Sequence, residues 1–442
     1  MKPPKFWYAG STGFNALALS PLASVYRFLS ERRWAKGAHV KMDVPVICVG
    51  NINLGGTGKT PTAIYLSLKL NKMDKNVHVV TRGYGGHLQG PVRVDINKHT
   101  ADDVGDEPIL LAGFAPTWVA KDRLAGVRSA IDAGAQCIIL DDGMQNPAVH
   151  KDLTILVVDS AVGFGNERIF PAGPLRESVQ SGVAKANVVL AIGGERAAKT
   201  LVKDTPMLND LPVLSGQLDV LQTGMDWQGL RALAFAGIGR PEKFYNSLRS
   251  AGVEIIQTRS FGDHQKLPVA ILKRLEAEAW QVDAQLVTTE KDAARLPKDW
   301  QQKVLTLPVR LSIDHDEVLD ARLAAMAPAF RDAQRGPDWW QSGGHSQGYP
   351  ALGSDRVLQI ARHCPRPKSH AHRMWQTRGK ARYWGDHSRA VLVPRQWSKN
   401  SSPDWRKRRY KHPRATYQYV AHAPLWRDAP MHPEWRSHCI NP

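Results

Sequence analysis

The chain has 442 residues, of which 43% are hydrophobic, so it is long enough for two or three domains with well-packed cores. Its formal net charge is +18, but residues 331–442 hold 21 Lys and Arg against 7 Asp and Glu and therefore carry most of that charge. The rest of the chain is nearly neutral, which argues against a nucleic-acid-binding protein, and we expect no nucleic-acid partner.

The N-terminal segment, residues 1–40, lacks the pattern of a signal peptide, and no run of 18 apolar residues that could span a bilayer occurs in the sequence. Ser20 and Pro21 predict the N-cap and first position of a helix that ends by Gly37. Its basic residues are Arg27, Arg32, Arg33 and Lys36. Basic and aromatic residues beside an apolar face are typical of a helix lying on an anionic membrane, although a helix packed on the core fits the pattern equally well.

Residues 44–70 contain the most informative motif. Residues 44–49 are apolar and β-branched and predict a buried parallel strand, and the residues from Pro61 onward predict a helix. The glycine-rich loop between them is typical of a P-loop, whose backbone amides and helix dipole hold phosphate groups. The residues expected to bind ATP are Asn53, Leu54, Gly55, Gly56, Thr57, Gly58, Lys59, Thr60 and Pro61.

Two residues of this loop have specific expected roles. Lys59 would add positive charge near the phosphates, and the hydroxyl of Thr60 would bind Mg²⁺. Asn53 stands where the strict motif has glycine, which leaves the geometry at the start of the loop open. A glycine-rich turn without a ligand is the alternative, and the flanking strand and helix argue against it.

The next predicted strand, residues 77–80, is followed by an Arg- and Gly-rich loop in which Arg82 and Tyr84 are candidate substrate contacts. Asp106 and Glu107 stand at the start of a further apolar helix. Acidic residues are common there because they complement the helix dipole, so the pair alone is weak evidence for a site.

A second phosphate-site signal lies at residues 137–142. The apolar strand 137–140 ends in Asp141 and Asp142, the arrangement of a Walker B strand, whose aspartate binds Mg²⁺ next to a P-loop. We expect Asp141 to be the metal ligand. Further strands at 155–158 and 188–192 alternate with helical stretches and predict a doubly wound parallel α/β sheet.

The cysteines at 48, 137, 364 and 439 show no metal-binding spacing. Cys48 and Cys137 fall within predicted strands, so we expect them to be small core residues of a protein in a reducing compartment.

Three domains are expected after the N-terminal segment. Residues 41–229 would form the P-loop kinase domain, and residues 230–330 a smaller α/β lobe with strands at 232–236 and 285–289. Residues 331–442 hold 8 of the 14 tryptophans and 9 of the 16 histidines without periodicity, a composition that does not readily bury a core. We interpret them as a disordered or non-native extension, with binding of nucleic acid or anionic lipid as the alternative.

Eight short motifs occur in the order found in tetraacyldisaccharide 4'-kinases, the lipid A kinases of Gram-negative bacteria, and the sequence resembles that family over residues 5–325. They are GGTGKTP at 55–61, RGYGG at 82–86, GDEP at 105–108, DDG at 141–143, PAGPLRE at 171–177, GIGRP at 237–241, FGDH at 261–264 and TEKD at 289–292. Met144 and Asn146 depart from the Phe-Gln-His that usually follows DDG, so only Gln145 carries over.

The resemblance implies that the γ-phosphate of ATP, with Mg²⁺, is transferred to the 4'-hydroxyl of a tetraacylated glucosamine disaccharide 1-phosphate, a lipid A precursor. It further implies a peripheral enzyme at the cytoplasmic face of the inner membrane. Asp106 would take the hydroxyl proton with His264 orienting and tuning it. The implied catalytic residues are Asp106, His264, Lys59 and Asp142, and the implied substrate contacts are Arg82, Tyr84, Glu107, Gln145 and Glu177.

Two other functions remain as alternatives. A P-loop ATPase or GTPase switch at the membrane surface would share the loop and the Walker B aspartate, although residues 289–292 lack the spacing of a guanine-recognition motif. A non-catalytic protein that binds membranes or nucleic acid would explain only the N-terminal helix and the basic tail. The sequence gives no sign of an obligate protein partner.

Overall fold

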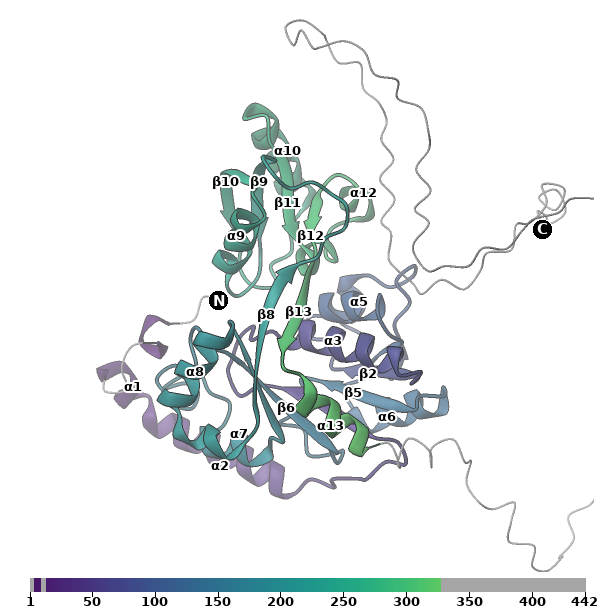
Figure 1. Ribbon diagram of the computed structural model, residues 1–442, viewed down its shortest axis with the longest axis vertical. Helices are drawn as coiled ribbons and strands as arrows, with labels where there is room; N and C mark the ends of the chain where they lie inside the picture. Colours follow the sequence, from purple (N-terminus) through teal and green to yellow (C-terminus); the bar gives the residue numbers. More distant parts are fainter. Residues whose placement is uncertain (1–3, 9–12, 327–442) are drawn as a thin grey trace, which may run out of the picture. The chain divides into compact units, whose positions relative to one another are not determined.

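The computed structural model describes residues 4–8 and 13–326, which belong to one compact unit, and the expected extension at 331–442 lies outside the described residues. The described residues form a nine-stranded sheet and a separate four-stranded sheet, each with helices packed on it (Figure 1).

The strands of the large sheet are β1 Val46–Gly50, β2 Val77–Thr81, β3 Val92–Arg93, β4 Thr117–Val119, β5 Cys137–Asp141, β6 Leu153–Asp159, β7 Val188–Ile192, β8 Val213–Val220 and β13 Val309–Asp314. Those of the small sheet are β9 Arg231–Ala236, β10 Glu254–Ser260, β11 Gln285–Thr289 and β12 Leu305–Leu307. The α-helices are α1 Phe14–Ala18, α2 Ser20–Ala35, α3 Lys59–Lys72, α4 Ala101–Val104, α5 Asp106–Ala112, α6 Arg123–Asp132, α7 Val179–Lys185, α8 Glu195–Asp204, α9 Pro241–Ser250, α10 Val269–Gln281, α11 Glu290–Ala293, α12 Lys298–Gln301 and α13 Glu317–Ala325. Two short 3₁₀ helices are η1 Lys5–Trp7 and η2 Pro206–Asp210.

The large sheet has the strand order β13-β8-β7-β6-β1-β5-β2-β4-β3. Every pairing from β8 to β4 is parallel, which confirms the expected doubly wound α/β fold. The two edge strands differ from that expectation, because β3 and β13 run antiparallel to their neighbours. The P-loop strand β1 lies between β5 and β6, so the loops that follow these three strands meet at one edge of the sheet.

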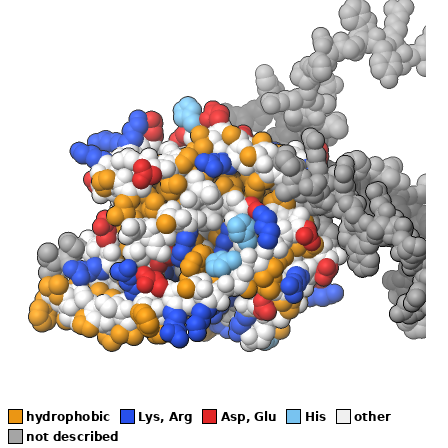
Figure 2. All heavy atoms as spheres, turned by 90° about the horizontal axis from the view of Figure 1, so that it is seen from below, with side chains coloured by type: hydrophobic (Ala, Val, Ile, Leu, Met, Phe, Trp, Pro, Cys, Tyr) orange, Lys and Arg blue, Asp and Glu red, His pale blue; other side chains and the backbone are white. Residues whose placement is uncertain are grey.

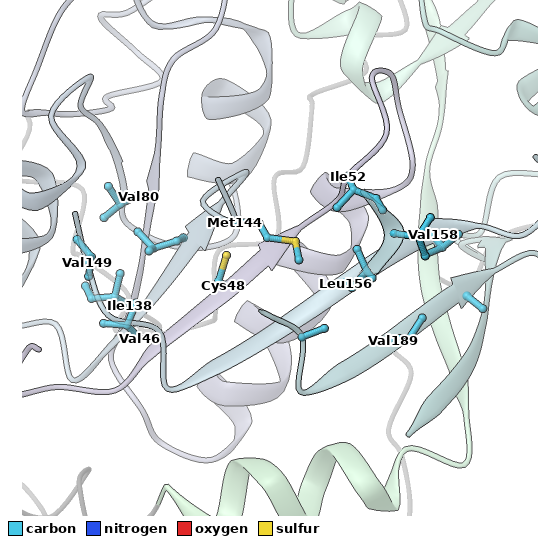
Figure 3. Close-up of a cluster of buried hydrophobic side chains, with 14 of the residues drawn as sticks. Val46, Cys48, Ile52, Val80, Ile138, Met144, Val149, Leu156, Val158 and Val189 are labelled. Atoms are coloured by element: carbon cyan, nitrogen blue, oxygen red, sulfur yellow. The ribbon is translucent and has the colours of Figure 1, made fainter. Parts of the chain in front are cut away.

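Both faces of the large sheet are covered by helices, which explains why its inner strands are apolar along their whole length. Helices α3, α5 and α13 bury their apolar side chains against one face, and α6, α7 and α8 against the other. Figure 3 shows the hydrophobic cluster on the face covered by α6, α7 and α8, in which Cys48 packs near Met144 and Val46. Cys137 is buried on the opposite face, so both cysteines are core residues as expected. Burial raises the pKa of the Cys48 thiol to about 12, which makes it a poor nucleophile.

The smaller lobe is a parallel sheet with α9 on one face and α10 on the other. The smaller lobe, expected to span residues 230–330, does not include β13 and α13, which return to the large sheet. Leu311, Leu319 and Leu323 are buried in its core, and Lys69 of α3 forms ion pairs with Asp316 and Asp320. No strand was expected from the sequence at residues 309–314, because their place in the large sheet depends on pairing with the distant strand β8.

The N-terminal helix begins differently from the expectation. Ser20 is the first residue of α2 and Leu19 is its N-cap, while the Ser20 hydroxyl donates to the carbonyl of Ala16 in α1. The large apolar residues that α1 and α2 expose to solvent are Phe14, Leu17, Leu22, Val25, Phe28 and Leu29. Hydrophobic and basic side chains gather along this edge of the molecule (Figure 2). Within the described part of the chain, no helix is both long enough and apolar enough to cross a membrane.

Candidate active site

A cavity of ≈ 840 Å³ opens at the carboxyl ends of β1 and β5. Its walls come from α2, from the loop between β1 and α3, from the residues after β2 and β5, and from the smaller lobe. This is the edge of a doubly wound sheet at which ligands bind, because loops from several strands converge there.

The loop between β1 and α3 has the backbone of a phosphate-binding turn. Gly55 and Gly58 have φ values of +126° and +101°, a conformation that side chains disfavour, so glycine is required at both. The Lys59 ammonium donates to Asn51 Oδ1 at 3.1 Å and lies 3.6 Å from Asp142 Oδ1. The amides at the start of α3 therefore face the cavity together with a positive charge, as anion binding requires.

Asn53 is the exception among the nine residues expected to bind ATP. The other eight line the cavity, but the Asn53 amide donates to the carbonyl of Gly163 at 3.0 Å and its backbone pairs with Leu175. The side chain is buried there. Asn53 therefore anchors the start of the loop to the segment after β6.

Asp141 and Asp142 stand side by side at the end of β5 but have opposite environments. Asp141 is 1% exposed, and burial raises its pKa to about 7, with the charges of Glu107 and Asp142 adding to the effect. Burial also disfavours the ionised form of Asp142, but Lys59 and Arg176 outweigh it and lower the pKa of Asp142 to about 2. Asp142 accepts a hydrogen bond from Arg176 at 2.8 Å.

Asp141 has one carboxylate oxygen without a hydrogen-bond partner among the described residues, and oxygen atoms are the ligands that Mg²⁺ prefers. Asp141 Oδ2 accepts from the Thr81 hydroxyl at 3.2 Å, but Oδ1 is buried without a hydrogen-bond partner in the described residues. The Thr57 hydroxyl is likewise buried and unpartnered. Mg²⁺ prefers oxygen ligands and keeps several waters, so one carboxylate and the Thr60 hydroxyl suffice as protein ligands. The part of the chain that the structure describes contains no cluster of three or more His, Cys, Asp and Glu suited to a metal.

Asp106 and His264 meet across the two lobes. Asp106 lies in the first turn of α5, and its Oδ1 and Oδ2 are 3.1 and 2.9 Å from His264 Nδ1. Burial raises the pKa of Asp106, but the hydrogen bond to His264 and the charges of Lys291 and Arg295 hold it below its usual value. His264 has φ +56°, a strained conformation that is common at functional sites. Asp106 is 3% exposed and lies just beneath the cavity wall, whereas His264 forms part of that wall.

The five expected substrate contacts all line the cavity: Arg82, Tyr84, Glu107, Gln145 and Glu177. The Tyr84 ring packs edge-on against His264 with centroids 5.3 Å apart. The Gln145 amide donates to Glu177 at 3.0 Å, so these two side chains form one polar unit. These five residues, from distant parts of the sequence, are therefore brought to a single cavity, whereas Asn53, Asp106 and Asp141 are not among the residues that line it.

Three further charged residues near the site were not among the expected site residues. Arg123 is buried beside Asp141 and Asp142, Arg295 lies 3.4 Å from Asp106, and Lys291 contacts Glu107 and His264. Lys291 belongs to the motif at 289–292, so that motif could have identified it as a site residue. Arg123 begins α6 and Arg295 lies in the turn after α11, and neither belongs to a motif that would have marked it.

Comparison with known proteins assigns the family. Residues 15–327 match the family model of tetraacyldisaccharide-1-P 4'-kinases. The chain belongs to this family. Curated tetraacyldisaccharide 4'-kinases from Dinoroseobacter shibae and Jannaschia sp. are 52% and 49% identical to it over 331 and 321 residues, or 74% and 73% of this chain and 98% of each relative.

The fold agrees with a solved family member. The crystal structure of LpxK from Aquifex aeolicus in complex with ATP has a TM-score of 0.56 and 24% identity to this chain, and the alignment covers 70% of this chain and 99% of that one. The match of the tetraacyldisaccharide-1-P 4'-kinase family ends at residue 327, just before the basic tail.

Both departures from the usual family motif have local explanations. Met144 is buried in the core, directly against Gly50, whose missing side chain leaves room for it (Figure 3). The Asn146 side chain accepts a hydrogen bond from the amide of Ala148 at 2.9 Å and so stabilises its own turn.

Proposed function

We propose that the chain is a lipid A 4'-kinase that transfers the γ-phosphate of ATP to the 4'-hydroxyl of a tetraacylated glucosamine disaccharide 1-phosphate. One observation supports the proposal: the glycine-rich loop at residues 54–61, Asp142 after the strand β5, and His264, which holds Asp106, line a single cavity between two lobes. Phosphoryl transfer to an alcohol needs these three elements, which hold phosphate, bind metal and accept a proton.

The nucleotide would lie along the P-loop. The backbone amides of residues 54–60 and the Lys59 ammonium would hold its phosphates, while Thr60 and Asp141 would hold Mg²⁺. The metal would neutralise charge on the phosphates as the bond to the leaving group breaks. Asp142, fixed between Lys59 and Arg176, would keep both cations directed at the transferred group.

The acceptor hydroxyl would lose its proton to the Asp106–His264 pair. His264 reaches the cavity and Asp106 does not, which favours a different division of roles from the one expected from sequence. In our proposal, His264 contacts the hydroxyl, and Asp106 fixes the ring and stabilises the charge that develops on it.

The acceptor's acyl chains would remain in the membrane while its sugar enters the cavity. Tyr26, Arg33 and Trp34 of α2 line one end of the cavity, and the exposed apolar residues of α1 and α2 lie on the same segment. We therefore propose that residues 1–40 dock the enzyme peripherally on the cytoplasmic face of the inner membrane. The kinase domain at residues 41–229 and the lobe expected at 230–330 would carry the activity, which would not require residues 331–442.

A membrane-associated ATPase switch would share the P-loop and Asp141, so the acceptor decides between the two functions. Purified protein should consume ATP only when the acylated disaccharide 1-phosphate is present in detergent micelles, and mass spectrometry should find one added phosphate on the lipid. Lys59→Ala should lower this rate by several powers of ten, because Lys59 neutralises transition-state charge. ATP consumption at the same rate without lipid, with no phosphorylated lipid formed, would favour the switch.

A further inference from the structure

Lys291 joins the two lobes at the Asp106–His264 pair. It lies in α11 of the smaller lobe, and its Nζ is 2.9 Å from Glu107 Oε1 in α5 and 3.2 Å from His264 Nε2. Burial lowers the pKa of Lys291, but Glu107, Asp106 and Asp263 outweigh that effect and raise it. Lys291 is therefore a charged ammonium group in this site.

The two partners of the imidazole permit one protonation state. An ammonium group can only donate, so His264 Nε2 must accept from Lys291. The Asp106 carboxylate is ionised and can only accept, so Nδ1 must carry the hydrogen. Both hydrogen bonds are satisfied only by a neutral ring with its proton on Nδ1.

The charged groups around His264 show why Lys291 is needed for that state. Asp106 lies 2.9 Å from Nδ1 and Asp263 lies 3.8 Å from Nε2, so two carboxylates favour a doubly protonated ring. Arg295 is paired with Asp106 and Asp292, and the Tyr84 ring is uncharged. Among the described residues that contact the ring itself, Lys291 is the one that opposes a second proton.

We propose that Lys291 is a positioning residue that keeps His264 neutral, as the Nδ1–H tautomer, by occupying the Nε2 lone pair until the acceptor hydroxyl takes its place. A neutral ring can then accept the proton of that hydroxyl at Nε2, whereas a doubly protonated ring cannot. Glu107 fixes the position of the ammonium and balances its charge. The catalytic meaning of this device rests on the proposed function, but the protonation state of the ring does not.

The protonation state can be measured directly. In protein labelled with ¹⁵N-histidine, the His264 signals, assigned by their loss in His264→Gln, should show the neutral Nδ1–H tautomer at pH 7. In Lys291→Met the ring should become doubly protonated or mix its tautomers, and Lys291→Arg should restore the original state. Unchanged His264 signals in a folded Lys291→Met protein would overturn the proposal. Lys291→Gln, which is also uncharged, replaces Lys291→Met if that variant does not fold.

The pH dependence of lipid phosphorylation is a second readout. The acid limb of kcat/KM should move up by about one pH unit in Lys291→Met, since the lost positive charge opposed ring protonation. Lys291→Arg should keep the original limb. The matched control is Lys69→Met, because Lys69 is similarly buried and bridges Asp316 and Asp320 far from the cavity. The Lys69→Met variant should have a lower Tm than the wild type and the same pH profile of kcat/KM.

The two readouts separate this inference from the proposed function. If the protein phosphorylates no lipid, the ¹⁵N signals still decide the role of Lys291. If Lys291→Met raises the KM for ATP while the tautomer and the acid limb stay unchanged, Lys291 contacts the nucleotide phosphates and the proposal is wrong.

Discussion

Asp141 is a carboxylate buried at the end of a strand, with one oxygen that accepts no hydrogen bond from the described residues. Such a group costs folding free energy when it is ionised, unless a cation neutralises it. Metal-binding aspartates often have this character, because the protein prepares a site that only the metal completes. Asp142, its neighbour, is already neutralised by Lys59 and Arg176.

The raised pKa of Asp141 leads to a stability prediction. Between pH 4 and 7 the folded protein holds a proton on Asp141 that the unfolded chain has lost, so the free energy of unfolding should fall as pH rises through this range. The depressed pKa of Asp142 acts only below about pH 4.

Asp141→Asn should therefore have a higher Tm than the wild type at pH 8 without Mg²⁺, with a smaller difference at pH 5. Mg²⁺ with ATP should raise the Tm of the wild type at pH 8 far more than that of Asp141→Asn. Calorimetry at the two pH values tests both statements, and a Tm for Asp141→Asn below that of wild type at pH 8 would contradict them.

The surroundings of Asn53 and Arg123 could not be predicted from the sequence. The P-loop motif identified the residues that face the cavity from 54 to 61, because glycine spacing and flanking elements determine that turn. The direction of Asn53 depends on Gly163, which is 110 positions away. Long-range contacts of this kind leave no local pattern.

Helix α2 is held to the protein on one side and exposes apolar residues on the other. Its Trp34 ring lies against Lys151 and Lys185, and Tyr26 packs edge-on against Phe170. Phe28 and Leu29 are 60% and 58% exposed. A membrane surface would cover such residues without disturbing the contacts that hold the helix.

Replacing Phe28 and Leu29 by serine should weaken binding to vesicles that contain anionic lipid by at least about tenfold, since each buried side chain contributes about 1.5–3 kcal/mol. Tm should stay nearly unchanged because both side chains are exposed. Trp280→Ser is the control, because Trp280 is 73% exposed on α10 of the smaller lobe. Vesicle flotation at two salt concentrations measures the effect. Equal loss of binding in both variants would show that exposed apolar area anywhere on the protein drives the association.

At the scale of the whole molecule, ion pairs hold the smaller lobe over the P-loop. Asp159 at the end of β6 is 1% exposed and pairs with Arg240 at 2.5 Å and Lys243 at 2.6 Å, both from the smaller lobe. Gly239 lies beside the backbone of Gly56 in the P-loop. These contacts close the cavity on the side of the smaller lobe and would exclude water from the reaction.

Asp159→Asn should loosen that closure, because two cations lose their shared carboxylate. We expect faster hydrogen exchange at residues 237–241 and 261–265, a several-fold lower kcat and only a small change in Tm. Lys303→Gln, which breaks an ion pair with Glu276 inside the smaller lobe, is the control. Identical exchange in Asp159→Asn and wild type would show that other contacts close the lobes.

The parallel inner strands of the sheets could be predicted from the sequence, but the edge strands of the large sheet could not. Apolar strands buried on both faces have a strong local pattern, and the strands at 188–192 and 285–289 match β7 and β11 at both ends. The short strand β3 and the return of β13 to the large sheet depend on pairing between distant segments. Likewise, the motifs suggested that Asp106 and His264 act together, but only the fold shows that Asp106 is buried beneath His264.

A double-mutant cycle on Asp106 and His264 tests whether these two residues act together in phosphate transfer. Single-turnover transfer of phosphate from ATP to the acylated disaccharide 1-phosphate is measured for Asp106→Asn, His264→Gln and the double variant. If the two residues form one proton-transfer unit, each single change should cost about 10²–10⁴-fold in rate, and the double variant should be little slower than the slower single variant. Losses that multiply, in correctly folded variants, would show instead that the two residues act independently and form no such unit.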